Sequence, residues 1–428
     1  MIILERGSAG FDAAWRRLPA TAGEPAAVPQ AIALPVDAGE VAAAIDHAHG
    51  RGLPVTVRGG GHSLCGSHLR AGALVLDLRE MYSVSVDLAG GVARVSGGAT
   101  SLDAARQLDA AGASFPVGHS PAVGLGGFLL SGGNGWGGTW WGVAGHRVRA
   151  ATVVTGDGRI RRVDEAADPE LMWAVRGAGA AFPGVVTEFS VDVEPVRVTV
   201  ERAVLTVDGS AAGRLGSLLD AAGERDGIEP TVLARPDTDG GSCTVVATGF
   251  APPAENAGAA GDLLRSFRLG EVTAPRFSGI GAMLAEIDDF ADEIQRSDHR
   301  WAAPSWQQVL DGLPMTLPAL SPHSSLLVAR APRPLLAEAP YMPPPALGVS
   351  AYAHLPSTAA PSAVEDARSW IRQALSPLGE DAGRYIGEAD LLPDAGGLRG
   401  CLSPGAVARL RRLRQLVDPD HVVDCALD

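Results

Sequence analysis

A histidine that follows three consecutive glycines has the surroundings that point most clearly to chemistry. Gly59, Gly60 and Gly61 precede His62, and a strand-like stretch at residues 53–58 runs directly into them. Glycine has no Cβ, so its N–H groups can crowd around an anion and its backbone can adopt angles that other residues avoid. The pattern predicts a sharp turn around a phosphate that delivers one imidazole to a ligand. An ordinary surface turn is the alternative.

A second glycine cluster, residues 118–138, strengthens the ligand interpretation. It reads GHSPAVGLGG and continues into SGGNGWGG, and we expect it to be too rich in glycine for a helix or an ordinary strand. Such a segment is typical of backbone laid against a large flat ligand. Neither cluster matches the dinucleotide fingerprint, because no G-x-G-x-x-G opens a helical segment with an acidic residue about 20 positions later. A nicotinamide-type Rossmann site is therefore disfavoured.

Several ordered motifs together resemble a known family. They are PVTVRGGGHSLCGSHLRAGALVLDLREM, SPAVGLGGFLLSGGNGWGG, LMWAVRGAGAAFPGVVTEF, and the closing motifs YIGEAD and LVDPDH. The chain thereby resembles the berberine-bridge-enzyme-like branch of the FAD-linked oxidases, in the vanillyl-alcohol-oxidase superfamily. The resemblance covers residues 25–195 and resumes at residues 385–423. It implies an α+β fold, with a PCMH-type two-lobed FAD-binding domain and an antiparallel-sheet substrate domain covered by helices.

The resemblance also implies an FAD cofactor held by a single covalent bond. In the family, the histidine after the glycine turn is bonded to the 8α-methyl of the flavin, and His62 stands at that position. Many members add a bond from a cysteine where this chain has Ser120, and a serine hydroxyl cannot make that thioether. The cofactor-binding residues that the resemblance implies are Arg58, Gly59, Gly60, Gly61, His62, Ser63, Gly118, Ser120, Val123, Gly124, Gly126, Gly127, Gly135, Val185, Val186 and Tyr385.

Glu388 is the candidate general base. In relatives the closing motif often reads Tyr-x-Asn-Tyr, with the second tyrosine facing the substrate, and Glu388 replaces that tyrosine here. A carboxylate beside a flavin and desolvated by aromatic residues would have its pKa raised towards neutrality, which suits a base. The alternative is a purely structural role, in which Glu388 pairs with an arginine such as Arg384.

Three more residues are candidates for the catalytic site. We expect Tyr385 to pack against the cofactor edge or to hydrogen-bond with it. Tyr352 and His354 stand on a strand-like stretch, residues 348–355. Side chains two positions apart on a strand share a face, so both could contact substrate. A tyrosine and a histidine of the core would look identical in the sequence.

Val123 bears on the use of oxygen. In the family, the residue three places after the second attachment position lines the space where dioxygen meets the reduced flavin, and a small residue there favours an oxidase. The resemblance therefore implies an FAD-dependent oxidase that transfers hydride from a small alcohol, amine or secondary-metabolism intermediate to flavin N5, with dioxygen reduced to hydrogen peroxide. A dehydrogenase, or a non-redox cyclase on the same scaffold, is the alternative.

Composition excludes several other function classes. The 428 residues carry a net charge of −14, which argues against nucleic acid or an anionic membrane surface as partner. All 35 basic side chains are arginine, so no Walker-A or Schiff-base lysine exists. No apolar stretch approaches about 18 residues, and we expect a cytoplasmic protein of undetermined oligomeric state. We expect its four cysteines to be reduced.

A metal site is a further alternative that the sequence disfavours. His62, Cys65 and His68 form an H-x2-C-x2-H pattern. Zinc usually takes four ligands arranged in spaced pairs, and no second pair of Cys or His follows at a finger-like distance. We therefore expect no metal.

The chain divides into three predicted regions. Residues 1–195 alternate helical and strand-like patterns and form the expected FAD-binding domain. Residues 196–380, the expected substrate domain, have longer strands and alanine-rich helices. Residues 381–428 are expected to return to the first domain. The predicted elements include helices at 37–51, 101–111, 211–222 and 256–267, strands at 198–207 and 243–249, and a C-terminal helix from Ser403 whose apolar positions are Val407, Leu410, Leu413, Leu416 and Val417.

Overall fold

The first sheet has four strands and carries the glycine turn. The computed structural model describes residues 1–18, 27–64, 66–252, 258–288, 292–379, 382–391 and 396–427. The strand order is β1 (Ile2–Glu5), β2 (Ala31–Leu34), β4 (Leu74–Asp77) and β3 (Val55–Arg58); β2, β4 and β3 are parallel, and β1 is antiparallel to β2. Helix α1 (Phe11–Arg16) precedes β2. The glycine turn begins where β3 ends.

The predicted helix over residues 37–51 is confirmed as α2 (Ala38–Gly50). The Asp37 side chain accepts a hydrogen bond from Glu40 N at 2.8 Å, which satisfies one of the unpaired N–H groups of the first turn. The Glu40 carboxylate also supports the helix start, because it accepts from Val36 N, the residue before the cap, at 3.0 Å. The helix packs its apolar side chains onto the first sheet and onto β7 of the next.

The second sheet is antiparallel and five-stranded. Its order is β5 (Val84–Asp87), β6 (Val92–Ser96), β9 (Gly184–Asp192), β7 (Val148–Thr155) and β8 (Ile160–Asp164). The helix predicted over residues 101–111 is confirmed as α3 (Ser101–Ala111), with a capping box between Thr100 and Asp103. Helix α6 (Pro169–Val175) lies against β8 and β7.

The second glycine cluster is more helical than the sequence predicts. Residues Leu125–Leu130 form α4, and Gly138–Trp141 form α5. Two glycines inside α4 cost about 1 kcal/mol each relative to alanine. Leu125 and Leu129 are fully buried, and burying a leucine side chain contributes about 1.5–3 kcal/mol. Tertiary packing therefore outweighs the local preference, and the expectation of a helix-free segment is wrong.

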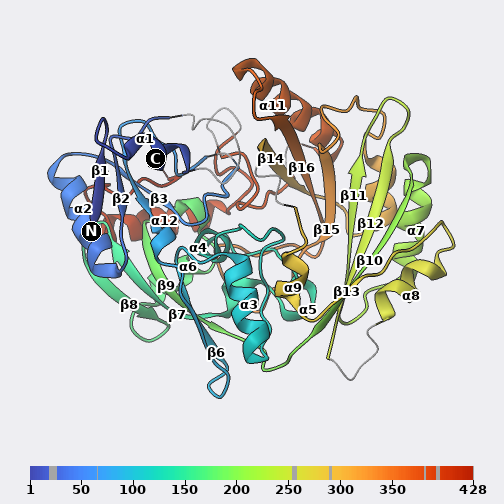
Figure 1. Ribbon diagram of the computed structural model, residues 1–428, viewed down its shortest axis with the longest axis horizontal. Helices are drawn as coiled ribbons and strands as arrows, with labels where there is room; N and C mark the ends of the chain where they lie inside the picture. Colours follow the sequence, from blue (N-terminus) through green and yellow to red (C-terminus); the bar gives the residue numbers. More distant parts are fainter. Residues whose placement is uncertain are drawn as a thin grey trace.

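The third sheet is antiparallel and seven-stranded. Its order is β13 (Arg276–Phe277), β10 (Thr199–Asp208), β12 (Ser242–Ala251), β11 (Ile228–Arg235), β15 (Ser325–Arg330), β16 (Leu347–Pro356) and β14 (Glu293–Trp301). The strands predicted at 198–207 and 243–249 are confirmed as β10 and β12. Figure 1 shows this sheet beside the first two, with α7 and α8 on its far side and α11 above β14 and β16.

Four helices cover the far face of the seven-stranded sheet. They are α7 (Ala212–Ala222), α8 (Ala259–Ser266), α10 (Trp306–Gly312) and α11 (Pro361–Leu375). The helix predicted over 211–222 is confirmed. The one predicted over 256–267 is described from residue 259, and its first two residues lie outside the described part. Helix α9 (Ile280–Leu284) packs on α3 instead.

The two faces of this sheet differ in polarity. On β16, Val349, Ala351 and Ala353 are fully buried beneath the helices. Tyr352 and His354 point to the opposite face and line one cavity with the glycine turn. The predicted alternation is thus confirmed, and the inward face of the sheet is available for polar contacts.

The C-terminal helix is confirmed as α12 (Pro404–Val417), with one exception on its predicted apolar face. Leu410, Leu413 and Val417 are buried, but Leu416 is 73% exposed because it lies beyond the edge of the face that these three residues form. The chain then returns to the first sheet, where Val55 N donates to Val422 O and Asp424 N donates to Val55 O, both at 2.8 Å. Figure 1 shows the C-terminus beside α1. The domain limits at 195 and 380 stay predictions.

None of the helices in the described residues is long and apolar enough to cross a membrane.

Candidate functional site

One large cavity joins both glycine clusters to the inward face of the seven-stranded sheet. Its volume is about 1180 Å³, whereas pockets for one drug-sized ligand span roughly 300–1,000 Å³. Residues 57–64 and 66–70, several residues between 118 and 134, and the closing motif around Glu388 contribute to its wall. The cavity therefore has room for a large cofactor together with a small substrate.

Most predicted site residues line this cavity. Glu388, Tyr385, Tyr352 and His354 do so, as does His62. The other predicted cofactor residues in its wall are Arg58, Gly59, Gly60, Gly61, Ser63, Gly118, Ser120, Val123, Gly124, Gly126, Gly127, Val185 and Val186. Gly135 does not line it. A Cβ at position 135 would lie 2.7 Å from the carbonyl carbon of Val117, so close backbone packing requires this glycine. Gly135 lines the smaller adjoining cavity instead, and its assignment to the cofactor stays a prediction.

Arg58 fixes the glycine turn from inside the protein. Its Nη1 donates to Gly59 O and its Nη2 to Gly60 O, both at 3.0 Å, and its Nε donates to Leu18 O at 2.6 Å. Nη1 also pairs with Asp77 at 3.2 Å. Burial lowers the pKa of Arg58 to about 10, so the guanidinium stays charged at neutral pH. The sequence places Arg58 among the cofactor contacts, and the structure shows what it binds: the backbone of the turn.

The two glycine clusters cross with their backbones in contact. A Cβ at position 60 would lie 2.7 Å from Gly124 Cα, and one at position 124 would lie 2.6 Å from Gly60 Cα. Real Cβ atoms do not approach backbone so closely, so only glycine can occupy either position. Gly127 differs, because a Cβ there would meet no atom within 4 Å. Packing between the clusters explains Gly60 and Gly124, and the open space beside Gly127 belongs to the cavity.

These residues fit a bound FAD. His62 lies in the wall next to the glycine turn, and the space at Gly127 leaves that wall open. Two carbonyl oxygens of the glycine turn accept hydrogen bonds from Arg58, so these two acceptors are satisfied within the protein. The metal alternative gains nothing from the structure. Cys65 lies outside the described residues, and among those described no group of three His, Cys, Asp or Glu side chains could hold a metal ion.

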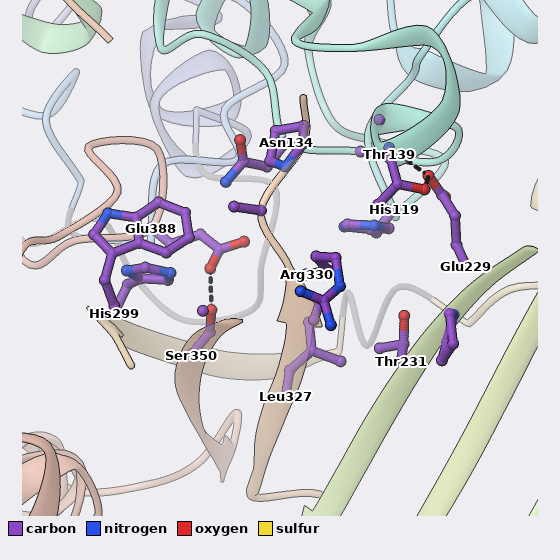
Figure 2. A pocket seen from close by; sticks show the side chains of 18 residues that line it. His119, Asn134, Thr139, Glu229, Thr231, His299, Leu327, Arg330, Ser350 and Glu388 are labelled. Atoms are coloured by element: carbon purple, nitrogen blue, oxygen red, sulfur yellow. Dashed lines mark hydrogen bonds between the residues drawn. The ribbon is translucent and has the colours of Figure 1, made fainter. Parts of the chain in front are cut away.

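Glu388 faces the inward side of the sheet and is bound by two hydroxyls. The Ser350 hydroxyl donates to Glu388 Oε2, a bond that Figure 2 shows, and the Tyr352 hydroxyl also hydrogen-bonds to the carboxylate. Burial raises the pKa of Glu388, and the two hydroxyls partly oppose that shift. Arg384, the arginine suggested as a structural partner of Glu388, instead binds Asp298 on β14, with Nη2 at 2.8 Å from Oδ1.

Tyr385 is held by residues that the sequence analysis missed. Asn134 N donates to the Tyr385 hydroxyl at 3.2 Å, and the Tyr341 hydroxyl donates to Asn134 Oδ1 at 2.6 Å. His299 Nδ1 accepts from Tyr385 N at 3.0 Å. Burial lowers the pKa of His299 to about 3, so its ring is neutral and Nε2 carries the proton. In the sequence, Asn134 could have been singled out as a site residue because it is a polar residue inside a glycine cluster. Nothing in the sequence singles out Tyr341 or His299.

His354 is occupied by a neighbouring carboxylate. Its Nδ1 lies 2.9 Å from Glu293 Oε2, and His323 Nδ1 lies 2.5 Å from Oε1 of the same carboxylate. Burial lowers the pKa of His354, although Glu293 partly opposes that shift. Both histidines line the cavity. The structure therefore places His354 at the site with its imidazole engaged by Glu293.

A second, much smaller cavity of about 50 Å³ adjoins the first and shares Glu388 and Asn134 with it. Figure 2 shows Glu229 reaching from β11 to Thr139 in the first turn of α5. Glu229 accepts from Gly137 N and Thr139 N, each at 2.7 Å, and from Thr139 Oγ1 at 2.6 Å. Burial raises its pKa despite these bonds. Glu229 thereby ties the loop of the second glycine cluster to the seven-stranded sheet.

Comparisons with known proteins indicate an FAD-binding domain. A family described as FAD binding domain matches residues 29–164. (R)-6-hydroxynicotine oxidase of Paenarthrobacter nicotinovorans is 35% identical over 273 residues, 62% of this chain and 59% of that protein. Glucooligosaccharide oxidase of Sarocladium strictum is 38% identical over 164 residues, 37% of this chain and 30% of that protein. These alignments span less than two thirds of either relative.

Solved structures match over nearly the whole chain. 6-Hydroxy-D-nicotine oxidase from Arthrobacter nicotinovorans superposes with a TM-score of 0.80 and 28% identity, over 98% of this chain and 96% of that one. The wild-type BBE-like 1 protein of Physcomitrella patens superposes with a TM-score of 0.81 and 16% identity, over 100% and 97%. The second likeness shows the fold alone. Together they confirm the predicted α+β fold.

Proposed function

We propose that this chain, which belongs to the berberine-bridge-enzyme-like FAD-linked oxidases of the vanillyl-alcohol-oxidase superfamily, is an FAD-dependent oxidase of a small organic metabolite. One observation carries the proposal. A carboxylate with a raised pKa, Glu388, lines the same cavity as His62 and the glycine turn. A candidate base and the candidate cofactor anchor therefore share one space.

His62 and the glycine turn would hold the cofactor. We infer a single covalent bond, from the His62 imidazole, because Ser120 stands where a second, sulfur-based bond would need cysteine. When bound, FAD supplies the two-electron acceptor, which takes hydride from the substrate and passes the electrons to dioxygen as hydrogen peroxide.

Glu388 would remove the proton from the substrate hydroxyl or amine. A base works best when its pKa lies near the working pH, and burial shifts the Glu388 pKa in that direction. The Ser350 and Tyr352 hydroxyls hold the carboxylate in position and stabilise its charged form. Tyr385, pinned through Asn134 and His299, would form the adjoining wall. These residues orient the substrate and accept its proton.

The relatives' names support the oxidase assignment. Two of them are called oxidases, of hydroxynicotine and of glucooligosaccharides. For this chain we propose an alcohol, an amine or a biosynthetic intermediate of secondary metabolism, because hydroxyls and amines find both donors and acceptors on the inward face of the sheet. Val123 lies in the cavity wall and leaves room for dioxygen in this proposal.

Anaerobic mixing of the purified protein with panels of alcohols, amines and phenols tests the proposal. A substrate is expected to bleach the flavin absorbance, and admitting air is expected to restore the colour with one hydrogen peroxide formed per product. Product formation without bleaching would indicate a non-redox role. Bleaching without reoxidation by air would indicate a dehydrogenase with another acceptor.

A further inference from the structure

Arg235 belongs to a row of side chains that crosses the inward face of the seven-stranded sheet. Ser325 on β15 pairs with Tyr352 on β16, and Tyr352 pairs with Ser297 on β14. Arg235 follows Ala234, whose partner on β15 is Leu326, so the antiparallel register sets Arg235 beside Ser325. All four side chains of the row line the large cavity.

The backbone of Arg235 pairs with Ser242 on β12, but its guanidinium has no hydrogen-bond or ion-pair partner among the described residues. Two carboxylates of the same cavity are already engaged: Glu293 by His323 and His354, and Glu388 by Ser350 and Tyr352. The charge of Arg235 lowers the pKa of His354, which places the guanidinium near that end of the cavity. Burial alone lowers the pKa of Arg235 itself. The guanidinium is therefore partly desolvated without a compensating anion.

A half-buried arginine without a partner in the protein is available to a ligand. Its charge has lost part of its hydration, and an anionic ligand that forms hydrogen bonds with it compensates for that loss. The planar guanidinium matches the two oxygens of a carboxylate and forms paired, charge-assisted hydrogen bonds with them. One uncompensated positive charge matches a monoanion better than a dianion such as phosphate.

We propose that Arg235 binds a carboxylate of the substrate, which is therefore an organic acid. Arg235 and Tyr352 are two strands apart, so their backbones are separated by roughly 10 Å at the usual spacing of about 4.8 Å. Tyr352 binds Glu388, the proposed base. The group to be oxidised and the carboxylate thus lie at opposite ends of a molecule of about this length. The position of the oxidised group rests on the proposed function, because Glu388 is the proposed base. The carboxylate site at Arg235 is independent of that proposal.

Calorimetric titration of the protein as purified tests the carboxylate site without any redox chemistry. The probes are 4-phenylbutyrate and its neutral amide, at neutral pH. Hydrogen bonds to charged groups contribute about 1.5–3 kcal/mol, so the wild type is expected to bind the acid about 10- to 100-fold more tightly than the amide. Arg235→Gln is expected to abolish that preference. Arg235→Lys is expected to keep part of it, because lysine retains the charge but not the fork.

Arg214→Gln is the matched control. Arg214 is an exposed arginine on α7, which packs on the far face of the same sheet, so the variant makes the same charge change outside the cavity and should keep the full preference. Equal affinities for acid and amide in the wild type, including no measurable binding of either, would overturn the proposal. So would a preference that persists in Arg235→Gln. A protein that passes this test but shows no flavin reduction with any acid would leave the carboxylate site standing and refute the proposed oxidase.

Discussion

Asp298 binds Arg384 through one oxygen, Oδ1, which accepts from Arg384 Nε at 3.1 Å and from Nη2 at 2.8 Å. The same oxygen accepts from Asp390 N at 3.2 Å. Arg384 and Asp298 are 4% and 10% exposed, so water contributes little to either charge. One carboxylate of β14 thereby fixes both ends of the segment that carries Tyr385 and Glu388.

Asp298→Asn is expected to lower the free energy of unfolding by about 3–5 kcal/mol, because it leaves Arg384 buried without its counter-charge. Urea denaturation measures the loss. Asp262→Asn, which breaks an exposed pair with Arg265 on α8, is the control and should cost no more than about 1 kcal/mol. Equal losses in the two variants would contradict the role given to Asp298.

Glu388→Gln is expected to slow flavin reduction by about 10²- to 10⁴-fold with little change in substrate affinity, because glutamine keeps the shape but accepts no proton. Burial raises the pKa of Glu388, so the carboxylate holds its proton to a higher pH than usual. The wild-type reduction rate should therefore rise with pH through this ionisation, and the variant should lack the rise.

Ser350→Ala sharpens this test. The Ser350 hydroxyl lowers the pKa of Glu388 by stabilising its charged form. Removing it should move the midpoint of the rate profile to higher pH while the plateau at high pH remains. Identical stopped-flow profiles in wild type, Ser350→Ala and Glu388→Gln would reduce Glu388 to a structural residue.

His62→Ala is expected to release the flavin from acid-denatured protein, whereas the wild type should precipitate yellow. Ser120→Ala should behave like the wild type, because the serine forms no bond to the cofactor. Absorbance of pellet and supernatant after acid treatment measures the outcome. A colourless wild-type pellet would refute the bond.

Gly60→Ala and Gly127→Ala should distinguish a glycine required for backbone packing from a glycine that leaves space for the cofactor. Alanine at 60 meets the backbone of Gly124, which has no flexible side chain to move, so the protein should lose stability. Alanine at 127 meets nothing within 4 Å, so the fold should survive while the added methyl enters the cavity and lowers flavin content. Thermal unfolding and the flavin-to-protein absorbance ratio give the two readouts. Similar unfolding temperatures for both variants would contradict this reading of the glycines.

Val123→Leu is expected to slow reoxidation by dioxygen and to leave flavin reduction nearly unchanged. The larger side chain narrows the cavity at this point. Space around Val123 is already tight, because a Cβ added at Gly118 would lie only 2.7 Å from Val123 Cγ1. Stopped-flow mixing of reduced protein with oxygenated buffer measures the rate. Unchanged reoxidation would remove Val123 from the oxygen path.

The sequence was most informative where local signals decide the structure. The Thr100 capping box marks the start of α3, and the strand period puts Tyr352 and His354 on one face. Strand pairing is not local: the partners of Glu388, and the place of Arg235 two strands from Tyr352, depend on the register of β11, β15 and β16. Helix α4 forms because buried leucines outweigh its glycines, a balance that only tertiary packing sets.

The contact between Val55 and residues 422–424 makes assembly of the site depend on the order of synthesis. Residues 423–427 line the same cavity as the glycine turn, although more than 350 positions separate them in the chain. The ribosome must therefore translate α12 and the following residues before this wall can close. The first two sheets can emerge and begin to fold much earlier, but the cavity wall is complete only after translation has passed residue 427.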